Sequence, residues 1–139
     1  VHLKGGKILI NDAYNANPKS MAMALETLAE MKGNGRAAAV LGDMLELGDF
    51  AGEAHQQIGQ KVRDLSIDFL LAMGEEAPVV VESAVRCGLS PERAWVVESH
   101  SEAVSILKQV MKKGDWILVK GSRRMTMEKI VEGLSERGA

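Results

Sequence analysis

A single cysteine, Cys87, stands in this chain of 139 residues, so no disulfide can form within one molecule. Cysteine-poor chains are typical of reducing compartments, and we expect a cytoplasmic protein in which Cys87 is buried and unreactive. Apolar runs are short: none approaches the roughly 20 residues of a membrane span, and no secretory signal is visible. Charge is nearly balanced, with 17 basic and 19 acidic residues, so no broad basic surface indicates nucleic acid.

The length and composition indicate one globular domain. With 46% hydrophobic residues, a chain of this length can build one core but is too short for two ordinary domains. We therefore treat residues 1–139 as a single domain. The sequence begins with Val1 and enters a strand-like run almost at once, so we expect it to be a piece of a longer protein.

Short apolar runs alternate with amphipathic runs along the whole chain. The expected strands are continuous apolar runs at 7–10, 37–41, 68–73, 94–98 and 116–120. The expected helices follow them at 18–31, 51–65, 77–87, 102–112 and 125–134. In the first helix, Met31 is expected to share the buried face of Met21 and Leu25. This alternation predicts a doubly wound, mostly parallel, Rossmann-like α/β sheet of about five or six strands with helices on both faces.

The carboxyl ends of the expected strands carry more polar groups than simple connections need. Such sheets bind ligands in the crevice beyond these ends, so the segments that follow the strands should meet at one edge. In chain order the segments read NDAYNAN, GDMLELGD, MGEE, ESHS and KGSRRM. The first, second and last are the richest in groups that form directed hydrogen bonds, and they supply the candidate site residues.

The first of these segments suits a nucleoside. Asp12 could accept hydrogen bonds from the vicinal hydroxyls of a ribose, and the amides of Asn15 and Asn17 suit a base edge or another amide. Tyr14 could stack on a base or simply cover the end of the sheet. The following helix directs its amino end toward this place and favours an anion. The simpler alternative is that Asp12 and Asn17 are only turn and cap residues.

The second segment brackets two carboxylates with glycines. Asp43 and Glu46 could hold an ammonium group or a cation, or could be exposed acids of an ordinary loop. No cysteine or histidine stands at ligand spacing beside them, so no metal site is predicted. His55 follows in the next helix, close to its apolar stripe. A packed histidine bonded to a backbone group is the alternative to a substrate contact there.

The last segment places Lys120, Gly121, Ser122 and Arg123 between a strand and a helix. Cations and a hydroxyl at the start of a helix suit an anion or a carboxylate. The order and spacing of the glycines differ from those of a phosphate-binding loop of the nucleotide-hydrolysing enzymes. A solvated basic turn is the alternative.

Three motifs taken together resemble one enzyme family. NDAYNANPKSM, LGDMLELG with His55 following, and LVKGSRRMTMEKIV occur in the order and spacing of the carboxyl-terminal domain of the Mur ligases. The resemblance covers nearly the whole chain. The Asn-Ala-Asn form of the first motif, at Asn15 and Asn17, favours the member that adds D-alanyl-D-alanine to UDP-N-acetylmuramoyl-tripeptide, because its relatives tend to carry histidine there.

The resemblance implies an ADP-forming amide ligase of peptidoglycan synthesis with three domains. An amino-terminal domain would hold the UDP-sugar peptide, and a central domain would carry the phosphate-binding loop and the Mg²⁺ ligands. The carboxyl-terminal domain would close as a lid over ATP and help to bind the incoming amino acid or dipeptide. ATP would phosphorylate the peptide carboxylate, and the amine of D-alanyl-D-alanine would attack the acyl phosphate.

The resemblance also implies roles for individual residues. Contacts with ATP are implied for Asp12, Tyr14 and Asn15, with Asp12 on the ribose. Substrate contacts are implied for Asn17, Asp43, Glu46, His55, Lys120, Gly121, Ser122 and Arg123. No catalytic residue or metal ligand is implied within this chain, which lacks the phosphate-binding loop, so we expect no ligase activity from it alone. A free-standing nucleotide- or anion-binding module and the same domain of a sister ligase remain open as alternatives.

Overall fold

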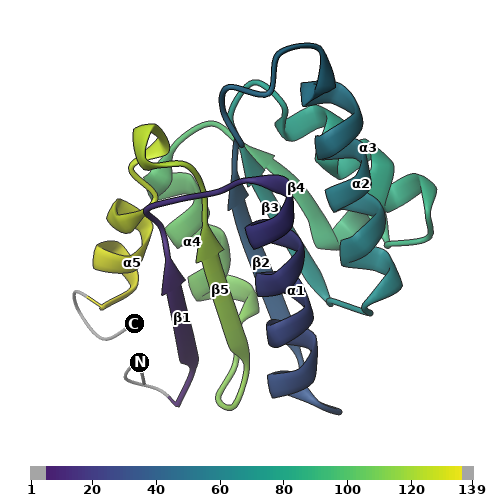
Figure 1. Ribbon diagram of the computed structural model, residues 1–139. Coiled ribbons are helices and arrows are strands. Elements are labelled where there is room, and N and C mark those ends of the chain that lie inside the picture. The colour runs from purple at the N-terminus through teal and green to yellow at the C-terminus, as the bar shows by residue number, and fades with distance from the viewer. Residues whose placement is uncertain (1–5, 136–139) are drawn as a thin grey trace.

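A computed structural model, which describes residues 6–135, shows a central sheet covered by helices (Figure 1). The strands lie in the order β1-β5-β2-β3-β4. Their bounds are Ile8–Asp12 (β1), Ala37–Gly42 (β2), Phe69–Met73 (β3), Ala94–Val97 (β4) and Trp116–Lys120 (β5). All neighbouring strands pair in parallel. The predicted doubly wound, mostly parallel sheet of five or six strands is therefore confirmed, with five strands in the part of the chain that is described.

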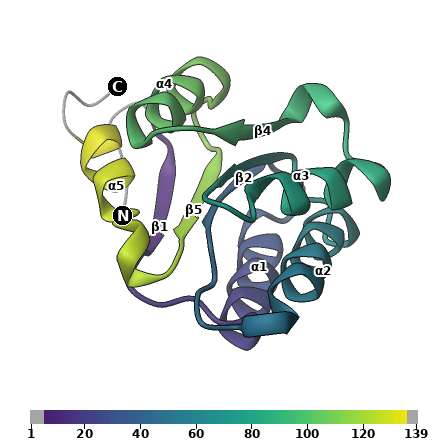
Figure 2. The ribbon, with the colours of Figure 1, turned by 90° about the horizontal axis from the view of Figure 1, so that it is seen from above.

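The helices form two layers, one on each face of the sheet (Figure 2). The first layer contains α1 (Pro18–Lys32), α2 (Ala51–Asp64) and α3 (Ala77–Arg86), and the second contains α4 (His100–Val110) and α5 (Glu128–Ser135). Successive residues of a strand face opposite sides. In β2, Ala39 and Leu41 pack against the first layer, whereas Ala38 and Val40 pack against the second. Burial on both faces explains why the strands read as unbroken apolar runs.

Local signals set the ends of the helices and account for two differences from expectation. Ser99 accepts a hydrogen bond from the Glu102 backbone, so α4 begins at His100, two positions before the expected start. Thr126 adopts a left-handed conformation, with φ of 49°, and this interrupts the single helix expected from Met125. A short 3₁₀ turn at Arg123–Met125 therefore precedes α5.

Two side chains expected to be buried are exposed. Met31 is 52% exposed, because ten residues of helix carry it about 80° away from the direction of Met21. Cys87 is also exposed, because it lies just beyond the last residue of α3. In the described residues, no helix combines the length and the apolar composition that crossing a membrane requires.

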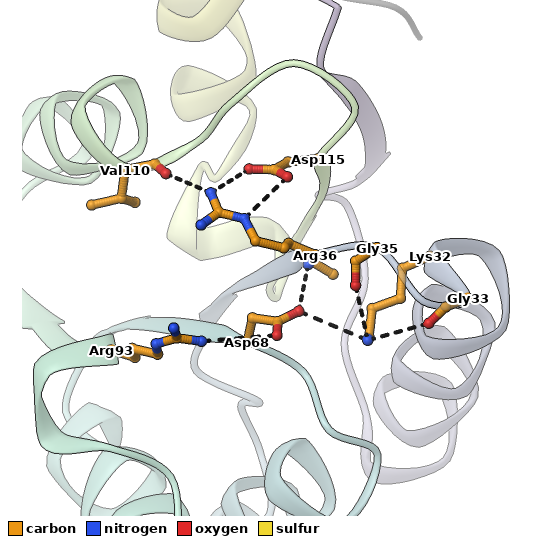
Figure 3. A network of polar contacts seen from close by, with 9 residues as sticks. Lys32, Gly33, Gly35, Arg36, Asp68, Arg93, Val110 and Asp115 are labelled. Atoms are coloured by element: carbon orange, nitrogen blue, oxygen red, sulfur yellow. Dashed lines mark hydrogen bonds and ion pairs between the residues drawn. The ribbon is translucent and has the colours of Figure 1, made fainter.

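Ion pairs join the loops at the amino-terminal edge of the sheet (Figure 3). Arg36 donates hydrogen bonds to both carboxylate oxygens of Asp115, at 3.2 and 2.6 Å. Hydrogen bonding to Asp115 raises the pKa of Arg36 above its ordinary value, so the guanidinium stays charged at physiological pH. Asp68 joins the network through ion pairs with Lys32 and Arg93, at 3.8 and 3.9 Å. This edge is opposite the carboxyl edge, where the candidate site residues follow the strands. We therefore assign to the network a role in the stability of the fold.

Candidate functional site

The strand order makes the connections diverge at the carboxyl edge of the sheet, and Figure 2 views this edge from above. The chain leaves β1 and β2 toward the first helical layer, but it leaves β5, which lies between them, toward the second layer. Connections that diverge from neighbouring strands leave room between them, and ligands of open α/β sheets bind at such points. A similar divergence occurs between β3 and β4, because α3 and α4 lie on opposite faces.

A cavity of about 510 Å³ lies at the crevice between β1, β5 and β2. Three segments that are distant in sequence line it: Tyr14, Asn15 and Ala16 after β1, Leu45 and Glu46 after β2, and Ser122, Arg123 and Arg124 after β5. The expectation that the first, second and last strand ends meet at one edge is confirmed. The structure thereby brings together five of the predicted site residues.

The lining of this cavity combines two cations with one carboxylate. Arg123 and Arg124 follow β5, and Glu46, which follows β2, faces the same space. Within residues 6–135, none of these three side chains forms an ion pair. Charged groups that are not neutralised within the chain remain available to a ligand. The pair of guanidinium groups suits a carboxylate or a phosphate, and Glu46 suits an ammonium group.

Two local features of the lining are unusual for an ordinary loop. Ser122 is 9% exposed, and its Oγ is buried without a hydrogen-bond partner among the described residues. Burying such a group costs about 1–3 kcal/mol, which is why native proteins seldom leave one unsatisfied without a reason. Glu46 has a φ of 61°, a left-handed conformation that is uncommon for a residue other than glycine. Departures of this kind concentrate at ligand sites.

Asp12 and Lys120 lie side by side at the ends of β1 and β5, where they are register partners. The Lys120 Nζ donates to Asp12 Oδ2 at 2.7 Å and to the Asn15 carbonyl oxygen at 2.9 Å. Lys120 is 1% exposed and is bonded within the fold in this arrangement, and its substrate contact stays a prediction. Its ammonium group is bonded to the last residue of β1 and to Asn15, and Lys120 is not among the residues that line the cavity. The Asp12 side chain remains 46% exposed.

Asp43 supports the neighbouring loop instead of facing the cavity. It is buried, and its two carboxylate oxygens accept hydrogen bonds from the backbone nitrogens of Glu75 and Glu76, at 2.9 and 3.0 Å. These hydrogen bonds join the segment that follows β2 to the segment that follows β3. Both carboxylate oxygens are engaged within the chain, and the substrate contact of Asp43 stays a prediction.

His55 is the packed histidine that the sequence left as an alternative. It is 2% exposed, its Nε2 accepts a hydrogen bond from the Met44 backbone nitrogen at 3.0 Å, and its Nδ1 lies 2.7 Å from the Ala51 carbonyl oxygen. This pattern requires the tautomer with the proton on Nδ1. Both ring nitrogens are engaged inside the fold, and the substrate contact of His55 stays a prediction.

Asn17 and Gly121 have clear structural roles, and their substrate contacts stay predictions. The Asn17 Oδ1 accepts a hydrogen bond from the Ser20 backbone at 2.9 Å, and the Ser20 hydroxyl accepts one from the Asn17 backbone at 3.1 Å. This reciprocal pair is a capping box at the start of α1. At Gly121 an added Cβ would lie 2.7 Å from Met127 Cγ and 3.2 Å from Gly42 Cα, so glycine permits the close approach of two strand ends.

A second cavity, of about 440 Å³, lies where β3 and β4 diverge. Its polar lining comes from Glu75, Glu98, Ser99 and His100, and Met125 closes it from the β5 side. The sequence predicts that MGEE and ESHS follow strands, but it indicates no role for these residues. The signal that could have found this place is the strand order, which a single sequence does not reveal.

Comparisons with known proteins agree with this architecture. The family described as "Mur ligase, glutamate ligase domain" matches residues 1–123. The UDP-N-acetylmuramoyl-tripeptide–D-alanyl-D-alanine ligase of Bacillus subtilis is 36% identical over 131 residues, which are 94% of this chain and 28% of that protein. The ligase of the same name from Escherichia coli is 34% identical over 139 residues, which are 99% of this chain and 29% of that protein.

Solved structures give the same result. The crystal structure of the MurF ligase from Thermotoga maritima in complex with ADP has a TM-score of 0.79 and 25% sequence identity, and the match covers 96% of this chain. It covers 29% of that protein, so the chain spans less than a third of the relatives that it matches in sequence or in structure. A family match over most of the chain, together with the shared fold, establishes that this chain belongs to the Mur ligase family, in its glutamate ligase domain.

Proposed function

We propose that the chain is the carboxyl-terminal lid domain of an ATP-dependent, ADP-forming amide ligase. The reaction would add D-alanyl-D-alanine to UDP-N-acetylmuramoyl-tripeptide in peptidoglycan synthesis. In this proposal the domain contributes to binding of ATP and of the dipeptide, whereas domains outside this chain hold the UDP-sugar peptide and the phosphoryl-transfer machinery. The lid excludes water from the labile acyl phosphate, and the isolated domain has no ligase activity.

The observation that carries this proposal is the cavity of about 510 Å³ at the carboxyl edge. It is lined by the same three segments whose sequences resemble the Mur ligases. A surface made from three loops at one edge is suited to closing over a ligand held by another domain. The B. subtilis and E. coli relatives named above support the choice of the dipeptide over a single amino acid.

The roles proposed for the lining follow from its chemistry. Asp12 offers an exposed carboxylate to the ribose hydroxyls, and Tyr14, which is 56% exposed, offers a ring face to the base. Arg123 suits the terminal carboxylate of the dipeptide, and Glu46 suits an ammonium group. The buried Ser122 hydroxyl provides one further hydrogen bond at the same place.

The proposal assigns ATP, but not its Mg²⁺, to the residues of this chain. Across residues 6–135, no group of three or more His, Cys, Asp or Glu side chains gathers closely enough to hold a metal ion. In this proposal the Mg²⁺ that accompanies ATP is held by domains outside this chain. The contribution of this chain is to bind the nucleoside end, to orient the amine and to exclude water.

The test is ADP release by the full-length polypeptide that contains this chain. The assay supplies UDP-N-acetylmuramoyl-tripeptide, ATP and Mg²⁺, with and without D-alanyl-D-alanine. The Asp12→Ala variant and the isolated 139-residue chain run beside it. We expect turnover that depends on the dipeptide, is weaker in the variant and is absent from the isolated chain.

Each other outcome would contradict part of the proposal and indicate a different function. Turnover that depends on a single amino acid and not on the dipeptide would identify a sister ligase. An absence of ADP release with every amine substrate would reject the ligase and leave a nucleotide- or anion-binding module. Full turnover by the isolated chain would reject the lid proposal, because it would require a complete active site within these residues.

A further inference from the structure

Among the described residues, Lys120 is the largest of the fully buried side chains, and its surroundings explain how it is accommodated. It ends an apolar strand, and its side chain is 2% exposed. An ammonium group removed from water needs acceptors, because an unpaired buried charge is very unfavourable. The structure supplies two, the Asp12 carboxylate at 2.7 Å and the Asn15 carbonyl oxygen at 2.9 Å.

The pairing fixes the direction of the Asp12 carboxylate. Asp12 and Lys120 stand opposite each other in the register of β1 and β5, so the contact is set by the sheet and not by a flexible loop. Oδ2 of Asp12 is taken by the ammonium group, while Oδ1 has no hydrogen-bond partner in the described part of the chain. With the side chain 46% exposed, Oδ1 remains available as an acceptor while Oδ2 is held by Lys120.

The same ammonium group also fixes the cavity wall. Its second bond is to the carbonyl of Asn15, which lines the cavity beside Tyr14. A single buried cation therefore holds both Asp12, the last residue of β1, and Asn15 in the segment that follows. It also balances the charge of Asp12, so that a polyanionic nucleotide does not meet an uncompensated carboxylate.

We propose that Lys120 is a positioning residue for recognition of the ribose. It acts through Asp12 and the segment that follows β1, without touching the ligand. The proposal rests on the function proposed above, in which Asp12 binds the ribose hydroxyls. It assigns to Lys120 a role different from the substrate contact that the motif implied. A purely structural lysine would support folding but would not change how the site distinguishes ribose from deoxyribose.

The experiment compares ATP with 2′-deoxy-ATP and 3′-deoxy-ATP in the full-length ligase. Four variants are used: Lys120→Met, which keeps the length of the side chain, Asp12→Asn, the double variant with both changes, and Lys129→Met as an exposed control. KM and kcat are measured for each nucleotide and KM for the dipeptide. Direct binding of a fluorescent ATP analogue is measured in parallel, so that the comparison does not depend on turnover.

Lys120→Met and Asp12→Asn should each raise KM for ATP about tenfold, the size expected for one charge-assisted hydrogen bond. Both should lose the preference for ATP over the deoxy nucleotides, and kcat and the dipeptide KM should change less. The double variant should match Asp12→Asn alone, because Lys120 acts through Asp12. The Lys129→Met control should behave as the unmodified enzyme.

Three results would overturn the proposal. Lys120→Met could keep its preference for ribose, it could raise the dipeptide KM instead, or the double variant could bind ATP about tenfold more weakly than Asp12→Asn. If Lys120→Met fails to fold, the comparison of Asp12→Asn with the double variant still decides, because the double change leaves no unpaired buried charge. Nucleotide binding without dipeptide-dependent turnover rejects the ligase function alone, and no nucleotide binding at all rejects both ideas.

Discussion

Replacing Gly59 by alanine should destabilise the fold, although alanine is the better helix former. Gly59 lies where α2 meets α3, and an added Cβ would overlap the Val80 carbonyl oxygen. It would also lie 2.9 Å from Ser83 Cβ and 3.0 Å from the Ala84 backbone nitrogen. Because two of these atoms are backbone, relief requires α3 to move. The Ser83 hydroxyl, which donates to the Gln56 carbonyl oxygen at 2.6 Å, opposes that movement.

Two opposing terms set the size of the effect. Alanine stabilises a helix interior by about 1 kcal/mol relative to glycine. Overpacking a tight contact costs about 1–3 kcal/mol, and contacts with backbone atoms place this site at the upper end. We therefore expect a net loss of about 2 kcal/mol in the free energy of unfolding. For 139 residues, an unfolding entropy of about 0.3 kcal/mol/K converts this loss to a fall in Tm of about 7 °C.

The assay is thermal and urea unfolding of the purified chain, followed by circular dichroism. Gly52→Ala is the matched control, because Gly52 lies in the same helix and nothing comes within 4 Å of an added Cβ. The control should gain up to about 1 kcal/mol. A gain in stability for Gly59→Ala as well would refute the reasoning, since it would mean that α2 and α3 do not approach closely at this residue.

Other substitutions test the supports and the cavity separately. Asp43→Asn should lose about 1.5–3 kcal/mol of stability in urea unfolding, because the single oxygen of an amide cannot replace both carboxylate oxygens that accept backbone N–H groups. Unchanged stability would contradict the buried role. Arg36→Met should lose about 1–3 kcal/mol by leaving the buried Asp115 without its cation, and unfolding of the chain measures it. Arg123→Ala should raise the dipeptide KM of the full-length ligase about tenfold and leave Tm unchanged, whereas Arg86→Ala, an exposed arginine at the other edge, should change neither.

The fold could be predicted because its main signals are local. Buried parallel strands produce continuous apolar runs, and the boundaries of β5 match the expectation at both ends. The differences arose where a tertiary contact or a single conformation overrides the pattern. Thr126 adopts a left-handed conformation, and its hydroxyl donates to the Met125 carbonyl oxygen and lies within hydrogen-bond distance of the His100 Nε2. The expected last helix is therefore divided at this residue. Met31 follows helical spacing but lies off the buried face.

The site could be predicted only as a set of segments. The polar groups at the strand ends are visible in the sequence, and the cavity lined by Tyr14, Glu46 and Arg123 lies where three of those segments meet. The direction in which each side chain points depends on neighbours that are distant in sequence. Asp43 and His55 stand in the same motifs as the lining residues, yet their partners turn them into the fold. Residue type and spacing alone do not distinguish these two orientations.

The motifs of this domain thus contain two kinds of polar residue, and perturbation should separate them. Asp43, His55 and Lys120 are buried and bonded to backbone or to a partner side chain, so each fixes the shape of a loop. Tyr14 and Arg123 are exposed in the cavity lining, and no residue in the described range neutralises the arginine. Changes of the first kind should alter stability and binding together, because the loop depends on them. Changes of the second kind should alter binding alone, because their partners belong to the ligand.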